Sequence, residues 1–165
     1  MKFSAIPATN ADAPAIASLL NSAAEHLTRQ FGQGHWSGRV TDRGVLWGIK
    51  TSRVLVVKDD ARIVAMLRLA TKKPWAIDVK YFVSVPRPLY LVGMVVEPGL
   101  QRQGLGRTLV EEATAVARAW PSEAIRLDAY DAEAGAGGFY AKCGFREVGR
   151  VTYRNVPLLY FELLL

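Results

Sequence analysis

The sequence predicts an α+β fold, with a mixed, mostly antiparallel central sheet flanked by helices. Three features predict this fold. Short runs rich in β-branched residues come in pairs separated by turn residues, as in hairpins. Two long segments carry apolar residues at three- and four-residue spacing, as amphipathic helices do. Between them lies a nearly continuous apolar run, typical of a strand with both faces covered.

The first part of the chain is expected to form a strand, two helices and a hairpin. The strand is Lys2–Ile6, where the residues alternate. Asp12 and Pro14 indicate the start of a long helix, because aspartate caps exposed amides and proline lacks an amide that has no partner there. This helix ends at Gly32. A short helix at Thr41–Ile49 and hairpin strands at Arg53–Lys58 and Arg62–Ala70 follow.

The second part begins with an irregular segment. Prolines and scattered aromatic residues interrupt the pattern over Thr71–Pro88, so we expect an ordered surface excursion. The apolar strand Leu89–Val96 follows it, and a helix then runs from Leu105 until Pro121 stops it. The last elements are a strand at Ala124–Ala129, a short helix including Phe139–Cys143, and a hairpin of Val148–Tyr153 and Leu158–Leu164. The order β-α-α-β-β-β-α-β-α-β-β fits a single domain over residues 1–165.

Composition excludes several classes of protein. Cys143 is the only cysteine, so no internal disulfide forms, and only His26 and His35 could join it in a metal site; we expect no metal. The longest apolar stretch, Leu89–Val96, is far shorter than the roughly 20 residues that span a bilayer. The N-terminus does not resemble a signal peptide. We therefore expect a cytoplasmic protein without a membrane partner.

The formal charge of +6 is concentrated in the first half of the chain. Lys and Arg outnumber Asp and Glu by 13 to 6 up to Val96, whereas the counts are 7 and 8 from Glu97 to Arg150. The longest basic run is only the pair Lys72-Lys73. This distribution argues against nucleic-acid binding, which remains an alternative through the basic first half.

The most informative stretch is Val95–Arg107, where an apolar strand leads through a glycine-containing loop into a helix. The amides of the first helical turn and the helix dipole favour an anion. Gly104 and Gly106 would let the backbone approach a phosphate closely, and Arg102 and Arg107 add positive charge.

Two other phosphate motifs fit this loop less well. Gly99 and Gly104 have the spacing of a P-loop, but Leu105-Gly106 stands where Lys-Ser/Thr is required. A dinucleotide-binding GxGxxG would need a third glycine where the chain has Leu109. The dinucleotide-binding motif also normally follows the first strand of its fold, whereas several strands and helices precede this loop.

The segment Gln101–Gly106 fits the [Q/R]-x-x-G-x-[G/A] pattern and resembles the GNAT superfamily of N-acetyltransferases. The strand ending in Val96-Glu97-Pro98 is similar to the fourth strand of that family, and Phe139–Phe145 resembles its later FYxKxGF segment. The element order also fits from Lys2 to the C-terminus.

The resemblance implies acetyl-CoA as co-substrate. Amides from Arg102 to Arg107 would bind the pyrophosphate, and the edge of Met94–Val96 would pair with the pantetheine amides. An N–H near Val96 would polarise the thioester carbonyl. The residues assigned to the cofactor are Met94, Val95, Val96, Gln101, Arg102, Gln103, Gly104, Leu105, Gly106 and Arg107.

The resemblance also implies that Tyr140 is the general acid. A phenol with a pKa of about 10 can protonate a departing thiolate with a pKa of about 8.5 held within hydrogen-bond reach. Glu133 replaces the asparagine that the family often has seven residues before this tyrosine. Cys143 is a candidate nucleophile for a two-step route, and a buried helix residue is the alternative. Gly135, Gly137 and Gly138 weaken a helix here by about 1 kcal/mol each, which a close cofactor or an unwound segment would explain.

Direct attack also requires a base that takes the proton of the amine. Glu97 is assigned this catalytic role, with Asp78, Asp128 and water as alternatives, since Tyr90 stands where some relatives have a carboxylate. Residues in the excursion are assigned to the acceptor: Trp75, Asp78, Tyr81 and Phe82.

The predicted function is acetyl transfer from acetyl-CoA to a primary amine of a small molecule or peptide. The alternative is a CoA-binding sensor of the same fold without catalysis. The sequence decides neither the acceptor nor whether the chain forms a homodimer.

Overall fold

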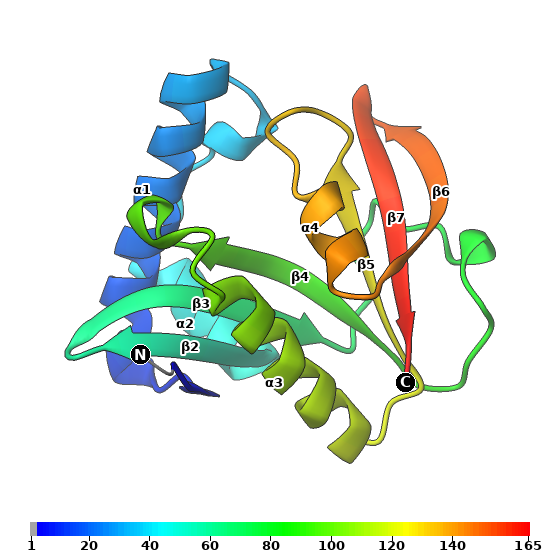
Figure 1. Ribbon diagram of the computed structural model, residues 1–165, viewed down its shortest axis with the longest axis horizontal. Helices are drawn as coiled ribbons and strands as arrows, with labels where there is room; N and C mark the ends of the chain where they lie inside the picture. The colour runs from blue at the N-terminus through cyan, green and yellow to red at the C-terminus, as the bar shows by residue number, and fades with distance from the viewer. Residues whose placement is uncertain (1–2) are drawn as a thin grey trace. The chain divides into compact units, whose positions relative to one another are not determined.

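A computed structural model describes residues 3–165 (Figure 1). These residues form two compact units. The first unit runs up to Leu69 and also includes Gly93–Ala113; the second consists of Ala70–Val92 and Thr114–Leu165. Strand β4 (Pro88–Val96) and helix α3 (Leu105–Ala119) therefore contribute residues to both units.

The first unit contains an antiparallel arrangement of strands. Strand β1 (Ala5–Pro7) pairs with β2 (Arg53–Asp59), which pairs in turn with β3 (Arg62–Ala70). The first strand was expected at Lys2–Ile6; Lys2 lies outside the described residues, and the strand extends to Pro7. The last part of β4 follows β3 in the sheet order.

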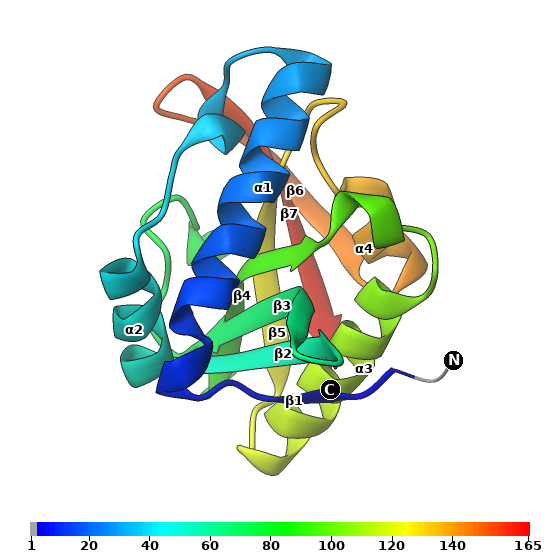
Figure 2. The same ribbon diagram turned by 90° about the vertical axis from the view of Figure 1, so that its left-hand side faces the viewer.

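Helices α1 (Ala13–Phe31) and α2 (Asp42–Thr51) cover one face of these strands. Helix α1 lies across the strands in Figure 2, and α2 lies beside it. Apolar residues of both helices form one cluster with alternate residues of β2 and β3: Ala13, Ile16, Ala17, Leu19, Val45, Val54, Val56, Ile63 and Met66. Strand residues of the opposite alternation, such as Leu55 and Leu67, are also fully buried, as a strand covered on both faces requires.

Both helices begin directly after a polar residue, although the Asp12 side chain makes no capping hydrogen bond to α1. The carboxylate of Asp12 accepts a hydrogen bond from the Thr9 amide (2.8 Å) and pairs with Lys58 (2.9 Å), which ties the start of α1 to β2. Thr41 caps α2, because its hydroxyl accepts a hydrogen bond from the Gly44 amide at 3.0 Å.

The second unit combines parallel and antiparallel strand pairs. The first half of β4 runs parallel to β5 (Ala124–Tyr130), which is antiparallel to β7 (Val156–Leu164); β7 also pairs with β6 (Arg146–Tyr153). Arg154 and Asn155 have φ angles of 49° and 66°, as a tight hairpin turn requires. The order β1-β2-β3-β4-β5-β7-β6 is mixed and mostly antiparallel, which confirms the predicted fold class.

Alternation along β7 divides the second unit into two sides. Leu159 and Phe161 face the short helix α4 (Gly137–Lys142), since the rings of Phe161 and Tyr140 are 6.1 Å apart and a Cβ on Gly137 would lie 3.0 Å from Leu159. Tyr160 and Glu162 face the other side, where residues 71–87 pack. Short 3₁₀ turns occur in the described residues at Asn10–Asp12, His35–Ser37, Val79–Tyr81 and Pro98–Leu100.

Within residues 3–165 no helix is long and apolar enough to cross a membrane. The same residues contain no group of three or more His, Cys, Asp or Glu side chains that could hold a metal ion.

Candidate functional site

The loop between β4 and α3 is open to solvent in the first unit. Gln101, Arg102, Gln103 and Gly104 are all exposed. Gly104 has a φ of 88°, and a Cβ placed there would have no atom within 4 Å. Glycine is therefore needed here for the backbone conformation, and the space beside it is open to a ligand.

Helix α3 begins directly after this glycine. The amide of Thr108 donates to the carbonyl of Gly104 at 3.0 Å, so the amides from Leu105 to Arg107 form the first turn and point out of the N-terminal end. The side chain of Leu105 is buried and anchors this turn, while Arg102 and Arg107 are exposed around it. Amide groups, helix dipole and arginine charge together favour an anion at this end.

The end of β4 lies beside this loop. Met94, Val95 and Val96 are half-buried, and the Gln101 side-chain amide lies 3.4 Å from the carbonyl of Val96. Glu97 continues along β3: its amide donates to the Val64 carbonyl at 2.8 Å, and its carboxylate pairs with Arg62. The structure thus gives Glu97 a tie to β3, and its role as the base stays a prediction.

Tyr140 lies on α4 in the second unit and is 7% exposed. Its ring packs against Phe145 at a centroid distance of 5.7 Å as well as against Phe161. Burial raises the pKa of Tyr140 well above its ordinary value, and Cys143 and Asp128 raise it further. The phenol therefore keeps its proton throughout the neutral pH range.

The glycines before Tyr140 lie mostly outside the helix interior. Helix α4 begins at Gly137, and Gly135 lies in a preceding turn where its amide donates to the Ala132 carbonyl at 2.9 Å. A Cβ on Gly135 would stand 1.9 Å from the carbonyl oxygen of Tyr130. The unwound segment considered from the sequence is thus present, and close backbone packing explains this glycine.

Asp128 lies on β5, directly opposite Tyr160 of β7. Residues opposite each other in an antiparallel pair share a face, so Asp128 lies on the side where residues 71–87 pack. Burial raises the pKa of Asp128 above its ordinary value of 3.8. This carboxyl group therefore holds a proton more tightly than an exposed aspartate does.

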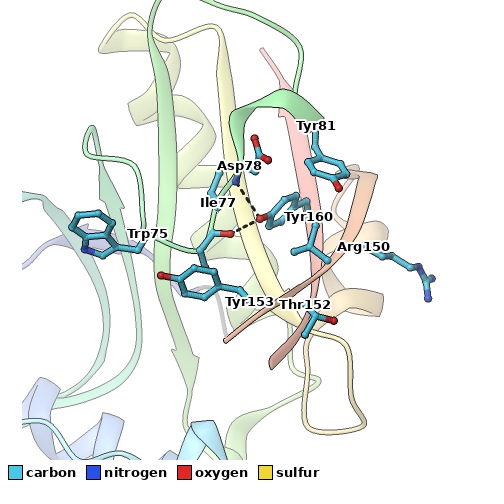
Figure 3. A pocket seen from close by; sticks show the side chains of 10 residues that line it. Trp75, Ile77, Asp78, Tyr81, Arg150, Thr152, Tyr153 and Tyr160 are labelled. Atoms are coloured by element: carbon cyan, nitrogen blue, oxygen red, sulfur yellow. Dashed lines mark hydrogen bonds between the residues drawn. The ribbon is translucent and has the colours of Figure 1, made fainter. Parts of the chain in front are cut away.

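A pocket of about 450 Å³ opens on this side of the second unit (Figure 3). Trp75, Asp78 and Tyr81, which were assigned to the acceptor from the sequence, line it. Residues of β6 and β7 that sequence analysis did not single out complete the wall: Arg150, Val151, Thr152, Tyr153 and Tyr160.

Phe82 lies away from this pocket, in the core. It is 7% exposed and packs against the ring of Tyr160 at 5.3 Å and the guanidinium of Arg126 at 5.1 Å. The 3₁₀ turn Val79–Tyr81 causes the difference, because it directs neighbouring side chains to different sides. Tyr81 instead covers Gly149, where a Cβ would lie 2.3 Å from its ring.

Buried polar groups hold the pocket wall in place. The hydroxyl of Tyr160 accepts from the Asp78 amide at 3.1 Å and donates to the carbonyl of Ala76 (Figure 3). Arg126 and Glu162, opposite each other in β5 and β7, hold the peptide groups of Val83: the guanidinium donates to its carbonyl (2.7 Å) and the carboxylate accepts from its amide (3.1 Å). The signal in the sequence that could have indicated these residues is the presence of a charged residue in a mostly apolar strand, Arg126 in β5 and Glu162 in β7.

Comparison with known proteins identifies the family. The profile of the acetyltransferase (GNAT) family matches residues 19–145. The chain belongs to the GNAT family. Its general activity is therefore acetyl transfer.

Several solved structures share the fold. The protein smu.2055 from Streptococcus mutans aligns with a TM-score of 0.76 and 20% identity over 99% of both chains. A ribosomal-protein-alanine N-acetyltransferase from Brucella melitensis aligns with a TM-score of 0.75 and 20% identity over 98% of this chain and 99% of that one. The acetyltransferase-like protein yncA from Salmonella typhimurium is described with its cofactor acetyl-CoA. It aligns with a TM-score of 0.74 and 19% identity over 99% of this chain and 94% of that one. No curated protein sequence matches the chain.

Replacing one member of the Arg126–Glu162 pair is expected to destabilise this GNAT protein strongly. Arg126→Met removes the guanidinium that binds the Val83 carbonyl and leaves the carboxylate of Glu162, which is 2% exposed, with the exposed Arg146 at 3.6 Å as its ion-pair partner. We expect a loss of about 3–5 kcal/mol in the free energy of unfolding, measured by urea denaturation. The double variant Arg126→Met/Glu162→Met should recover much of this loss.

The control for that experiment is Arg39→Met, which removes an exposed ion pair with Glu25 and should cost less than about 1 kcal/mol. A loss in the double variant equal to the sum of the losses in Arg126→Met and Glu162→Met would show that the two charges do not depend on each other.

Removing the carboxylate of Asp128 is expected to stabilise the fold at neutral pH. Because burial raises the pKa of Asp128, ionisation opposes folding. This opposition is absent below the ordinary pKa of 3.8 and develops as pH rises through the raised value. Asp128→Asn should therefore melt at a higher temperature than the parent near neutral pH and match it in strong acid. A lower melting temperature at neutral pH would contradict this.

Proposed function

We propose that the chain transfers the acetyl group of acetyl-CoA to a primary amine by direct attack. The observation that carries this proposal is the open N-terminal end of α3, with Gly104 at a φ of 88° and no atom near its Cβ position. A diphosphate needs such converging amides and such free space. Membership of the GNAT family supports acetyl-CoA as the source of that diphosphate.

The donor is bound by backbone groups in this proposal. The amides from Arg102 to Arg107 hold the pyrophosphate, and the side chains of Arg102 and Arg107 add charge from the exposed rim. Met94–Val96 offers a strand edge to the pantetheine amides. The description of the Salmonella protein with acetyl-CoA supports this use of the fold.

The reaction conserves atoms and charge. The amine lone pair forms a C–N bond to the thioester carbonyl, whose oxygen becomes an oxyanion facing the amide near Val96. The C–S bond then breaks, and the thiolate receives the phenolic proton of Tyr140. The base takes the proton released by the amine, and the phenol regains its own proton from solvent.

The high pKa of Tyr140 affects its part in this reaction. A phenol that holds its proton tightly is a weaker acid but a dependable hydrogen-bond donor to the departing sulfur. Transfer is completed more easily if the thiolate is also withdrawn from water, because burial raises its basicity as well.

Asp128 is the carboxylate best suited to act as base. Burial raises its pKa, and register places it on the face that carries the pocket. Glu97 pairs with Arg62, and Asp78 lies 3.5 Å from Lys80. Asp128→Asn is then expected to be slower by roughly 10²–10⁴-fold in kcat, despite the stability predicted above.

The pocket is proposed to hold the part of the acceptor that does not react. Its aromatic walls, with Trp75 83% exposed, offer stacking surface, and the carboxylate of Asp78 offers a partner for a cation. A small-molecule amine or the end of a peptide fits this chemistry.

Donor binding should depend on Gly104. Saturating acetyl-CoA is expected to raise the melting temperature of the parent protein, and Gly104→Asp should abolish this shift by placing a negative side chain at the phosphate site. The matched control is Gly99→Asp, since Gly99 also has open space around its Cβ position. Calorimetric titration checks both variants; undiminished binding by Gly104→Asp would disprove the assigned site.

Turnover should depend on the hydroxyl of Tyr140. Tyr140→Phe is expected to lower kcat by roughly 10²-fold or more while acetyl-CoA still binds, because only the proton donor is lost. Thiol release is measured with a panel of amines. Cys143→Ala should retain turnover, whereas its inactivity would favour a two-step route through Cys143.

A CoA-binding sensor is the second candidate function, and the replacement of the usual asparagine by exposed Glu133 favours it. A sensor would show the acetyl-CoA shift without thiol release for any amine in the panel.

A further inference from the structure

Helix α2 presents an unusual stripe on its solvent side. Arg43, Leu46, Trp47 and Lys50 recur at the spacing i, i+3, i+4, i+7, which normally marks the buried face of a helix. Here Leu46 is 39% and Trp47 63% exposed, and both cations are exposed as well. We call these residues the α2 stripe.

The α2 stripe is not required to hold α2 on the first unit. That task falls to the opposite side of the helix, where Val45 is buried in the cluster with α1 and Ile49 packs against it. Gly48 is also buried on that side, against the Arg68 side chain. The contacts that hold α2 on the first unit therefore do not involve the side chain of Trp47.

The α2 stripe borders a hollow of about 600 Å³. Its wall consists of Thr41, Arg43, Gly44, Leu46, Trp47 and Lys50. The space beside Gly44 is open, because a Cβ there would have only the Thr41 hydroxyl within 4 Å, at 3.4 Å. A hollow with an indole beside it fits one inserted apolar or aromatic side chain.

The charges around this hollow have one sign. Arg43 and Lys50, one at each end of the apolar pair, are the charged residues of its wall, and the Lys50 ammonium lies 5.9 Å from the Trp47 ring centroid. Asp42 is exposed at the helix start but lies outside the wall. A complementary partner therefore carries acidic groups on both sides of an apolar one.

Two other occupants fit less well. In a two-fold pairing of α2 with a second copy, Arg43 of one chain would meet Lys50 of the other, and like charges would oppose each other. A bilayer surface favours a protruding apolar face, whereas the indole here borders a hollow.

We infer that the α2 stripe is a docking site for an acidic peptide segment of another protein, which inserts an apolar or aromatic side chain beside Trp47 and pairs its carboxylates with Arg43 and Lys50. This site uses none of the residues assigned to acetyl transfer, so it stands whether or not the proposed catalytic roles hold.

The test uses the full chain and a fluorescein-labelled peptide, acetyl-Glu-Glu-Leu-Phe-Glu-Glu-amide. Fluorescence anisotropy at low salt should show saturable binding that weakens as salt is added. Trp47→Ala and the double variant Arg43→Glu/Lys50→Glu should each weaken binding roughly tenfold or more. Gly44→Leu, which fills the hollow from its floor, should weaken it without changing charge.

The control is Arg118→Glu, which reverses one charge, half the change in the double variant, at an exposed position of α3 and should leave the affinity within about twofold. A peptide with Ser-Gly in place of Leu-Phe should bind at least about tenfold more weakly, because it cannot fill the hollow.

Several results would overturn the inference. These are no saturable binding, equal loss in Arg118→Glu and the stripe variants, or equal binding of the Ser-Gly peptide. Binding to phosphatidylserine vesicles without binding to the peptide would assign the stripe to membranes. Self-association in sedimentation that Arg43→Glu/Lys50→Glu abolishes would assign it to a second copy.

Discussion

The structure of the second unit depends on two buried charged side chains that bind the backbone of Val83, a residue of the irregular segment 71–87. Arg126 and Glu162 face each other across neighbouring strands and bind the carbonyl and the amide of Val83. Each charge also has a second contact, since Arg126 donates to the Tyr90 hydroxyl at 3.1 Å and Glu162 lies 3.6 Å from the Arg146 guanidinium. Arg126 Nε and Glu162 Oε1 are nevertheless buried without a hydrogen-bond partner, so breaking the arrangement is costly. Phe82 and Tyr90 lie within 6 Å of the guanidinium and complete its surroundings. Because Tyr160 holds the Ala76–Asp78 stretch nearby, a segment without regular secondary structure becomes a fixed pocket wall.

In the loop after β4, by contrast, the proposed function requires backbone amides that remain exposed to solvent. Leu105 is buried and holds the start of α3, while the preceding residues stay in solvent. The positive φ angles of Arg102 and Gly104 bend the chain back so that the helix can begin at once. An anchored helix with an unobstructed end suits a ligand that is recognised by backbone groups, since side chains then contribute charge and little shape.

Much of this could be predicted from the sequence, and the reasons are physical. Strand and helix periodicity depends on local burial, so the β2–β3 hairpin, α1 and α3 were found close to their observed bounds. Capping chemistry is equally local: Thr41 caps α2, whereas Asp12 stands at the N-cap of α1 but its carboxylate accepts from the Thr9 amide before the helix instead of from an amide of α1. The exposed loop before α3 was expected because glycines, charge and a helix start are adjacent in the chain, and its use for a diphosphate is our proposal. The prediction of the short helix α4 was less accurate. The turn at Gly135 packs against the carbonyl of Tyr130, and sequence patterns within one element do not reveal such a contact.

The pocket was only partly predictable because its residues come from distant segments. Trp75 and Asp78 belong to the excursion, but the opposite wall comes from β6 and β7. Phe82 was misplaced because neighbouring aromatic residues diverge at a 3₁₀ turn. Gly149 shows a further consequence. Since its missing side chain is what gives the ring of Tyr81 a place to lie, a single methyl group added there would push that ring toward the cavity. If the pocket holds the acceptor as proposed, one codon would change the range of acceptors without altering the residues to which we assign the chemistry.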